Sequence, residues 1–341
     1  MIAIEVLASS KMNARVLKIS KGPKQLSTPS YFPAISRSRM HLPADAVLTL
    51  VLSVVYPRVL VSTYDFSQMA RENRAKVLGE ISNYFRNGSF VMLDSGIFES
   101  CRNHDAAWTF KQYAKWVRSV DSDFYFSYDV LPHVSNSDER LFERTLSQIR
   151  RSKSVTGSSE CIPVVHGLTP KQLIRQFRKL VFHYPQFFNM ISVTERDCGK
   201  TLSERATTIL SLRRILKERH ADSPIHVLGC GDPISIALYT YCGADTFDSL
   251  DWSEMVFDRN ELRIVNLSQL ELLRCDCKAC KRPIKDPQMR ALLHNLRFYQ
   301  DYGMKLQTMT KRGTLRDYLI EFVGLELMES VDKYASKEAP Q

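Results

Sequence analysis

The stretch Phe90-Val91-Met92-Leu93-Asp94 is a short apolar run that stops at a carboxylate, and the turn-forming residues Ser95 and Gly96 follow it. A run of this length between polar residues is typical of a buried strand. Similar runs recur at residues 31–36, 58–63, 124–129, 162–166, 190–194, 225–229 and 245–248. Helical periodicity fills the gaps between them, at residues 67–86, 105–120, 137–153, 170–181, 203–220 and 233–242. Eight such units in about 220 residues predict an α/β fold, a TIM-type (β/α)8 barrel.

A cysteine cluster near the C-terminus predicts a metal site. Cys275, Cys277 and Cys280 lie within six residues, and His294 follows fourteen positions later. Three thiolates and one imidazole favour a closed tetrahedral site for structural Zn²⁺. Two alternatives stay open at this point: the cysteines could be an accidental cluster in a basic loop, and His294, which lies among leucines, could be a core residue.

The strand–helix rhythm breaks near residue 260, which divides the chain into three parts. We expect residues 1–260 to form the barrel core, with the barrel proper starting at about residue 28. Residues 261–300 would form a small zinc-binding subdomain, and residues 301–341 a C-terminal helical segment that packs on the barrel. Helical patterns cover residues 287–302 and 312–330 of this region.

Composition narrows the range of partners. A formal charge of +10 over 341 residues and a pI near 9.2 favour an anionic partner, with nucleic acid first and an acidic membrane surface second. A merely solvated basic surface is the plain alternative. The other five cysteines are scattered singly, which fits a reducing cytoplasm. Pro57 and Arg58 interrupt the apolar stretch 46–62, so we expect a buried helix and a strand there, and no membrane partner.

Three of the predicted strands end at aspartates: Asp94, Asp129 and Asp248. Singly, each could cap the next helix; together, at the end of a barrel where strands meet, they predict a polar pocket. Two convergent carboxylates can act as nucleophile and general acid/base at a sugar carbon. Asp245 and Asp251 flank Asp248 and are rivals for the attacking group; Asp245 is the weaker rival because it lies deeper in the strand.

Five short motifs carry a resemblance to one family. Asp94-Ser95-Gly96-Ile97-Phe98 resembles the D-S-G-G-F motif of tRNA-guanine transglycosylases, and Gly243-Ala244-Asp245-Thr246-Phe247-Asp248 resembles their G-x-D-x-F-D motif. The Cys275, Cys277, Cys280 and His294 set is similar to their zinc site. The segments at residues 28–33 and 62–64 are similar to two further family motifs, and all five occur in the family's order.

The resemblance implies a barrel with an inserted zinc subdomain, often paired as a homodimer, that exchanges guanine in a nucleic acid for a 7-deazaguanine base. It implies that Asp248 is the nucleophile that forms a covalent glycosyl-enzyme and that Asp94 is the general acid/base. The zinc would have a structural role only. The resemblance also implies substrate-binding residues around the base: Ser95, Phe98, Asp129, His166, Gly167 and Glu195.

The sequence departs from the family around the base pocket while it keeps both aspartates. The departures are Ile97, Glu99, Leu131, His166 and the Asp251-Trp252 pair. This pattern is similar to the branch that places 7-cyano-7-deazaguanine in DNA, so DNA is the expected substrate and tRNA the alternative. In both cases the target base must be flipped out, and on DNA helper proteins could open the duplex. A non-catalytic nucleic-acid-binding partner subunit is the third alternative.

Overall fold

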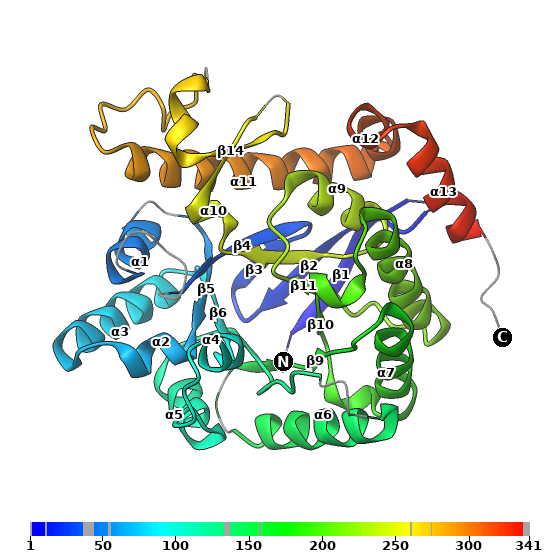
Figure 1. Cartoon of the computed structure of the whole chain (residues 1–341), viewed down its shortest axis with the longest axis horizontal. Helices are drawn as coiled ribbons and strands as arrows, with labels where there is room; N and C mark the ends of the chain where they lie inside the picture. Colours follow the sequence, from blue (N-terminus) through cyan, green and yellow to red (C-terminus); the bar gives the residue numbers. More distant parts are fainter. Residues whose placement is uncertain are drawn as a thin grey trace.

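The computed structural model describes residues 2–10, 12–36, 44–53, 56–132, 137–155, 157, 159–259, 261–273 and 275–336. Its centre is a parallel sheet that curves round on itself (Figure 1). The strands are β4 (Ser30–Ile35), β5 (Arg58–Ser62), β6 (Phe90–Asp94), β7 (Phe124–Phe126), β8 (Glu160–Ile162), β9 (Val164–Val165), β10 (Ile191–Thr194), β11 (Ile225–Leu228) and β12 (Thr246–Ser249). Each corresponds to one of the predicted runs, so the predicted α/β barrel is confirmed.

The barrel closes at its fifth strand, which is divided into two short pieces, β8 and β9. Strand β8 pairs with β7, whereas β9 pairs with β10, and the two pieces are separated only by Pro163. Proline has no N–H to donate to a ladder, which explains the break in the strand. The chain between Glu160 and Val165 therefore joins the two ends of the sheet and gives eight strand positions around the barrel.

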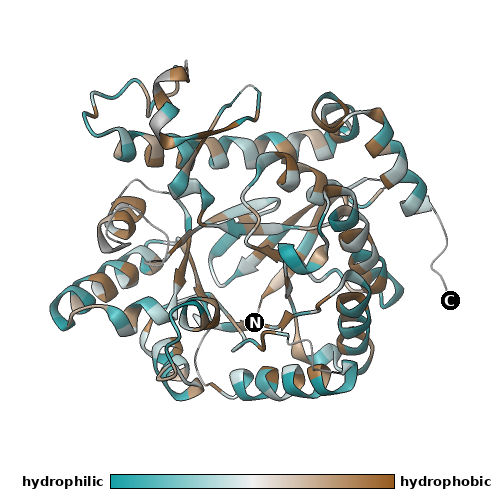
Figure 2. Cartoon of the chain, in the orientation of Figure 1, coloured by the Kyte–Doolittle hydropathy of each residue, from teal (hydrophilic) through white to brown (hydrophobic). Residues whose placement is uncertain are grey.

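Helices surround the barrel, as Figure 1 shows. They are α1 (Ala44–Ser53), α2 (Thr63–Gln68), α3 (Arg71–Arg86), α4 (Ile97–Arg102), α5 (Phe110–Ser119), α6 (Asp138–Lys153), α7 (Pro170–His183), α8 (Leu202–Glu218), α9 (Pro233–Tyr241) and α10 (Asp251–Glu254), with short 3₁₀ turns at Pro185–Phe187 and Glu195–Cys198. The barrel strands are largely apolar, whereas the helices mix apolar and hydrophilic residues (Figure 2). The large core therefore lies between the strands and the inner faces of the helices.

An N-terminal antiparallel sheet, which the sequence analysis did not predict, packs against the interior of the barrel. Its strands are β1 (Ala3–Ser9), β2 (Arg15–Lys21) and β3 (Lys24–Ser27). Leu17, Ile19 and Leu26 of this sheet form one apolar cluster with side chains from inside the barrel, among them Phe90 and Phe124. Lys24 also binds the carbonyl oxygen of Ser89, just before β6. The sheet thus closes the amino-terminal end of the barrel, and the opposite end is left for a site.

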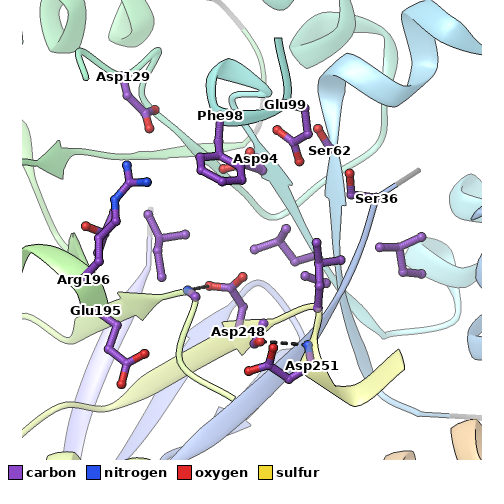
Figure 3. A pocket seen from close by; sticks show the side chains of 18 of the residues that line it. Ser36, Ser62, Asp94, Phe98, Glu99, Asp129, Glu195, Arg196, Asp248 and Asp251 are labelled. Carbon is purple, nitrogen blue, oxygen red and sulfur yellow. Dashed lines mark hydrogen bonds between the residues drawn. The ribbon is translucent and has the colours of Figure 1, made fainter. Parts of the chain in front are cut away.

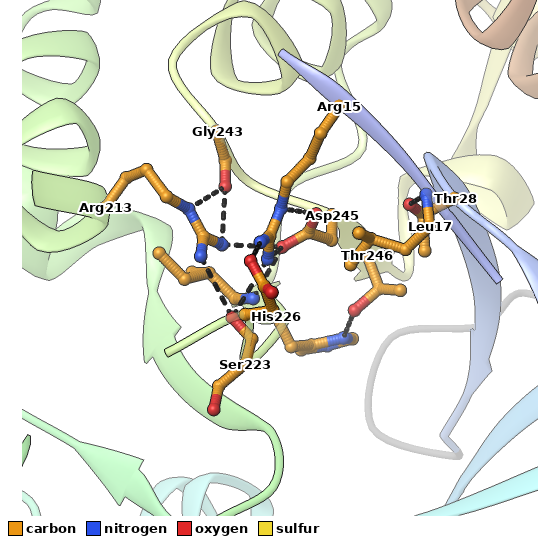
Figure 4. Close-up of polar contacts among 11 residues, drawn as sticks. Arg15, Leu17, Thr28, Arg213, Ser223, His226, Gly243, Asp245 and Thr246 are labelled. Carbon is orange, nitrogen blue, oxygen red and sulfur yellow. Dashed lines mark hydrogen bonds and ion pairs between the residues drawn. The ribbon is translucent and has the colours of Figure 1, made fainter. Parts of the chain in front are cut away.

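A buried charge cluster joins this sheet to the barrel (Figure 4). The carboxylate of Asp245 accepts from Arg15 Nε at 2.8 Å and from an Arg213 guanidinium nitrogen at 2.7 Å. Asp245 and Arg213 are at most 1% exposed. Asp245 precedes β12 and lies at the amino-terminal end of the barrel, with its charge neutralised by two arginines. It is therefore a structural residue rather than a rival nucleophile.

Replacing Asp245 with asparagine should lower the free energy of unfolding by about 3–5 kcal/mol, because two buried guanidinium groups would lose their carboxylate. Urea denaturation measures this difference. Asp222→Asn is the matched control, since Asp222 also faces Arg15, at 3.6 Å, but is 68% exposed. We expect less than about 1 kcal/mol from that surface pair. Equal losses in the two variants would contradict the structural role of Asp245.

The C-terminal part of the chain packs against one side of the barrel. It contains the hairpin β13 (Met255–Phe257) and β14 (Ile264–Asn266), a 3₁₀ turn at Leu267–Leu272, and the helices α11 (Pro287–Arg312), α12 (Leu315–Val323) and α13 (Leu325–Ser336). Helix α11 is longer than the predicted 287–302, and the predicted 312–330 helix is two helices separated at Gly324. In the part of the chain described here, no helix is both long and apolar enough to cross a bilayer.

Candidate active site and metal centre

The carboxyl ends of the barrel strands surround a cavity of about 270 Å³. Acidic side chains from both halves of the barrel point into it (Figure 3). Asp94 lies on one wall and Asp248 on the opposite wall, so the two predicted catalytic aspartates face one cavity. The other lining residues used below are Phe98, Glu99, Asp129, His166, Thr194, Glu195, Arg196, Arg205, Gly229 and Asp251.

Asp94 is the last residue of β6, and the turn after it fixes its carboxylate. Gly96 has φ of 73°, and a Cβ atom there would come within 2.5 Å of the Tyr64 side chain, so only glycine fits. The Gly96 N–H donates to Asp94 Oδ2 at 3.0 Å. Burial, followed by the nearby carboxylates of Glu99 and Asp129, raises the pKa of Asp94 well above its ordinary value. Asp94 therefore holds a proton at pH values where an ordinary aspartate does not.

Asp248 lies in β12 and is 6% exposed. One carboxylate oxygen, Oδ1, accepts from the Gly229 N–H at 3.3 Å and lies 3.0 Å from His226 Nε2. These contacts fix the carboxylate at the end of the strand while the residue still lines the cavity. An aspartate fixed in this way can attack an electrophilic carbon held in the cavity.

His166 lies between two aspartates. Its Nδ1 is 2.7 Å from Asp197 Oδ2, and its Nε2 is 3.4 Å from Asp129 Oδ2. Burial alone would lower the pKa of His166, but the hydrogen bonds to Asp129 and Asp197 outweigh it and raise the pKa to about 9. The other oxygen of Asp129 is buried and has no partner among the described residues, as is true of the Thr194 hydroxyl. Both residues line the cavity, so a polar ligand bound there could supply the missing hydrogen bonds.

The hydrogen bonds of His166 to Asp129 and Asp197 should make the stability of the protein depend on pH. Because the pKa of His166 in the folded protein is about 9 and exceeds the ordinary 6.5, protonated His166 stabilises the fold fully below pH 6.5, and this stabilisation is lost as pH rises through 9. The shift corresponds to about 3 kcal/mol at most. We expect the thermal unfolding midpoint to fall between pH 7 and pH 10 in the wild type and to fall less in His166→Gln. Parallel curves for the two proteins would show that His166 does not titrate in this range.

Phe98, Arg196 and Glu195 lie around the outer part of the cavity. Phe98 is 44% exposed, and the Arg196 guanidinium lies 5.3 Å from its ring centre. Glu195 accepts from Tyr239 Oη at 3.0 Å and pairs with Arg205 at 3.0 Å, so its carboxylate is held from behind. The exposed ring offers a flat face to a ligand, and Arg196 covers that face in this structure.

Two predicted substrate-binding residues do not line the cavity. Ser95 is buried, its hydroxyl accepts from the Ile97 N–H, and its carbonyl oxygen accepts from Trp108. Gly167 packs against α7, where a Cβ atom would lie 2.4 Å from the Leu173 nitrogen. Both residues shape the walls. Direct substrate contact stays a prediction for them.

The rival nucleophile Asp251 does line the cavity, next to Asp248. It lies in the first turn of α10, beyond the strand, and its N–H donates to the Ser249 hydroxyl at 2.9 Å. Trp252, which follows it, is fully buried and donates to the Ala34 carbonyl at 2.7 Å. Trp252 thus attaches α10 to the first barrel strand, whereas Asp251 bonds back to the end of β12.

The predicted metal ligands converge. The ligand atoms of Cys275, Cys277, Cys280 and His294 all lie within 4.8 Å of one another. His294 Nδ1 is 3.3 Å from Cys280 Sγ and 3.6 Å from Cys277 Sγ, which are distances expected between two ligands of one tetrahedral zinc. The cysteines are therefore not an accidental cluster, and they could hold a structural zinc.

His294 is both a core residue and a candidate ligand. It is 1% exposed, and its Nε2 lies 2.7 Å from the Phe257 carbonyl oxygen. An N–H donated to that carbonyl leaves Nδ1 unprotonated and turned towards the thiols, as zinc-binding histidines require. His294 can therefore be a buried core residue and a metal ligand at once, because Nε2 bonds to the Phe257 carbonyl while Nδ1 faces the thiols.

The fold and the site define the chain as a TIM-barrel protein with an acidic cavity at the carboxyl ends of its strands and an attached Cys3His metal module. The chain belongs to the queuine tRNA-ribosyltransferase family, whose model matches residues 10–325. A tRNA-guanine(15) transglycosylase of Methanopyrus kandleri is 23% identical over 279 residues, which are 79% of this chain and 58% of that protein. One of Pyrobaculum aerophilum is 23% identical over 344 residues, 93% of this chain and 66% of that protein. The chain thus spans less than two thirds of these relatives.

Proposed function

We propose that this protein is a guanine transglycosylase that replaces guanine in a nucleic acid through a covalent aspartyl-glycosyl intermediate. The observation that carries the proposal is the pair Asp94 and Asp248, which face each other across one cavity but occupy different environments. Asp94 carries a raised pKa, and Asp248 is held by a histidine and a backbone N–H. Two carboxyl groups with different environments can divide the acid and nucleophile roles.

The reaction proceeds in two displacements. The free oxygen of Asp248 attacks the sugar C1′ atom, the C1′–N9 bond breaks, and its electron pair leaves with guanine, which accepts the proton of Asp94. In the second displacement the incoming base gives a proton to Asp94 and attacks C1′, and the Asp248 carboxylate leaves. The incoming base is proposed to be a 7-deazaguanine such as 7-cyano-7-deazaguanine.

The remaining cavity residues would hold the base. Asp129 offers a buried oxygen that has no partner among the described residues, which suits the N–H groups of a guanine edge, and the neighbouring His166 holds the other oxygen of Asp129. Phe98 would stack on the base, with Arg196 displaced from its ring or stacked on the other side. Glu195 would support this region through Arg205 and Tyr239.

The relatives named above support tRNA as the substrate better than DNA. The altered pocket is the specific reason to keep DNA as a second candidate: Glu99, His166 and the Asp251-Trp252 pair all depart from the family pattern and lie in or beside the cavity. The charge of +10 suits the phosphate backbone of either. Pairing into a homodimer, and a helper protein that opens a duplex, belong to the same proposal.

A labelled-guanine exchange assay on tRNA and on single- and double-stranded DNA, with mass spectrometry of the nucleosides, tests the proposal. Exchange into tRNA alone supports the tRNA substrate, and a deazapurine nucleoside in DNA supports the second candidate. If neither nucleic acid exchanges its guanine, the transglycosylase proposal is wrong, and a binding-only partner subunit becomes the better explanation.

A further inference from the structure

We infer that His226 is the positioning residue of the proposed nucleophile and that it controls the release of the covalent intermediate. The inference rests on the proposed function and assigns a role to a side chain that does not line the cavity. His226 lies in β11, next to β12, in register with Thr246. Its side chain is fully buried inside the barrel.

Both nitrogens of the His226 ring have partners. Nδ1 contacts the Thr246 hydroxyl (Figure 4), at a distance of 2.9 Å, and Nε2 is 3.0 Å from Asp248 Oδ1. The Thr246 hydroxyl can donate to Nδ1, so the ring keeps its proton on Nε2 and donates it to the carboxylate. The ring is also packed against Phe126, with ring centres 5.0 Å apart. Packing on one side and hydrogen bonds at both nitrogens leave the ring a single orientation.

This contact distinguishes the two carboxylate oxygens of Asp248. His226 and Gly229 both bind Oδ1, so the other oxygen is the one available to attack. In the glycosyl-enzyme Oδ1 becomes an ester carbonyl, which accepts a hydrogen bond more weakly than a carboxylate does. When the incoming base displaces the ester, negative charge returns to Oδ1, and a donor already in place stabilises it. His226 therefore favours release of the intermediate over its accumulation.

Replacing His226 with glutamine or with asparagine distinguishes its hydrogen bond to Asp248 from its contribution to packing. The amide of glutamine can occupy the position of Nε2 and keep the bond to Asp248, whereas the shorter asparagine can reach only the position of Nδ1 and keep the bond to Thr246. We expect His226→Asn to reduce the exchange rate by about 10- to 100-fold, the usual effect of one lost donor to a charged group. His226→Gln should recover most of the rate.

The experiment uses the full chain with labelled guanine and the nucleic acid on which the wild type is active. The fraction of enzyme trapped covalently on that nucleic acid is measured by denaturing electrophoresis. A slow exchange with an enlarged trapped fraction in His226→Asn, reversed in His226→Gln, supports the inference, provided that both variants unfold at the wild-type temperature. Wild-type exchange and trapping in His226→Asn would refute it and leave the proposed function intact. A wild type without any exchange would overturn both.

Discussion

Asp248→Asn should reduce guanine exchange by at least about 10⁴-fold, the usual scale when a nucleophile is removed. An amide oxygen has too little negative charge to attack the sugar carbon and form the ester. The substitution keeps the size of the side chain and an oxygen that can accept from Gly229 and His226. The variant should therefore fold, and circular dichroism with thermal unfolding would check that it does. Exchange is measured with labelled guanine, and the covalent complex by denaturing electrophoresis.

Asp251→Asn is the matched control for this prediction, because Asp251 lies in the same cavity but beyond the strand. We expect it to retain exchange within about tenfold of the wild type and to form the covalent complex. If instead Asp251→Asn abolishes the complex and Asp248→Asn forms it, the nucleophile is Asp251. That result would move the reacting centre from β12 to α10, and the role inferred for His226 would be wrong as well.

The barrel could be predicted from sequence because most of its strands are short, mainly apolar and buried on both faces. Phe90–Leu93, for example, is an entirely buried and uninterrupted apolar run, and Ile191–Val193 is entirely buried with Ser192 as its one polar residue. The convergence of Asp94 and Asp248 then follows from topology, since parallel strands bring their carboxyl ends to one side. The metal ligands were recognisable for a different reason: cysteines with such spacing rarely serve any other purpose.

The N-terminal sheet could not be predicted in the same way. Strand β1 has only half-buried and exposed residues, so it lacks the apolar alternation that marks a strand. Strand β2 contains Arg15, and arginine is seldom buried inside a protein. Arg15 can be buried here because it pairs with the carboxylate of Asp245, which is 230 positions away in the sequence. The sequence around Arg15 gives no indication of this distant partner.

His226 and Asp197 were missed for a related reason. Each is a polar residue whose function depends on a second residue, Asp248 or His166, that is 22 or 31 positions away. Within Ile225-His226-Val227-Leu228 a histidine is read as a core residue, which is correct as far as burial is concerned. Its hydrogen bond across neighbouring strands becomes visible only in the folded barrel. The raised pKa of His166 likewise requires both of its aspartates to be in place.

The small size of the metal module's own core leads to the second large prediction. Among the described residues, its buried apolar cluster consists of Val256, Leu270 and Ala291 and is separate from the cores of the barrel. Burial of three such residues contributes little stabilisation. Ordering the backbone of the module costs roughly 1–2 kcal/mol of conformational entropy per residue. Structural zinc sites contribute about 10–16 kcal/mol of apparent binding energy in small modules. The fold of residues 261–273 and 275–286 should therefore depend on the metal.

Cys280→Ser should abolish stoichiometric zinc binding and open this module while the barrel stays folded. Metal analysis of the purified protein should give about one zinc per chain in the wild type and almost none in the variant. Trypsin should then cleave the variant rapidly after the lysines of the module, Lys278, Lys281 and Lys285. Cys101→Ser is the control, since Cys101 is an exposed free cysteine outside the cluster, and it should keep both zinc and protease resistance. A metal-free Cys280→Ser protein that resists trypsin as the wild type does would show that apolar packing alone holds the module.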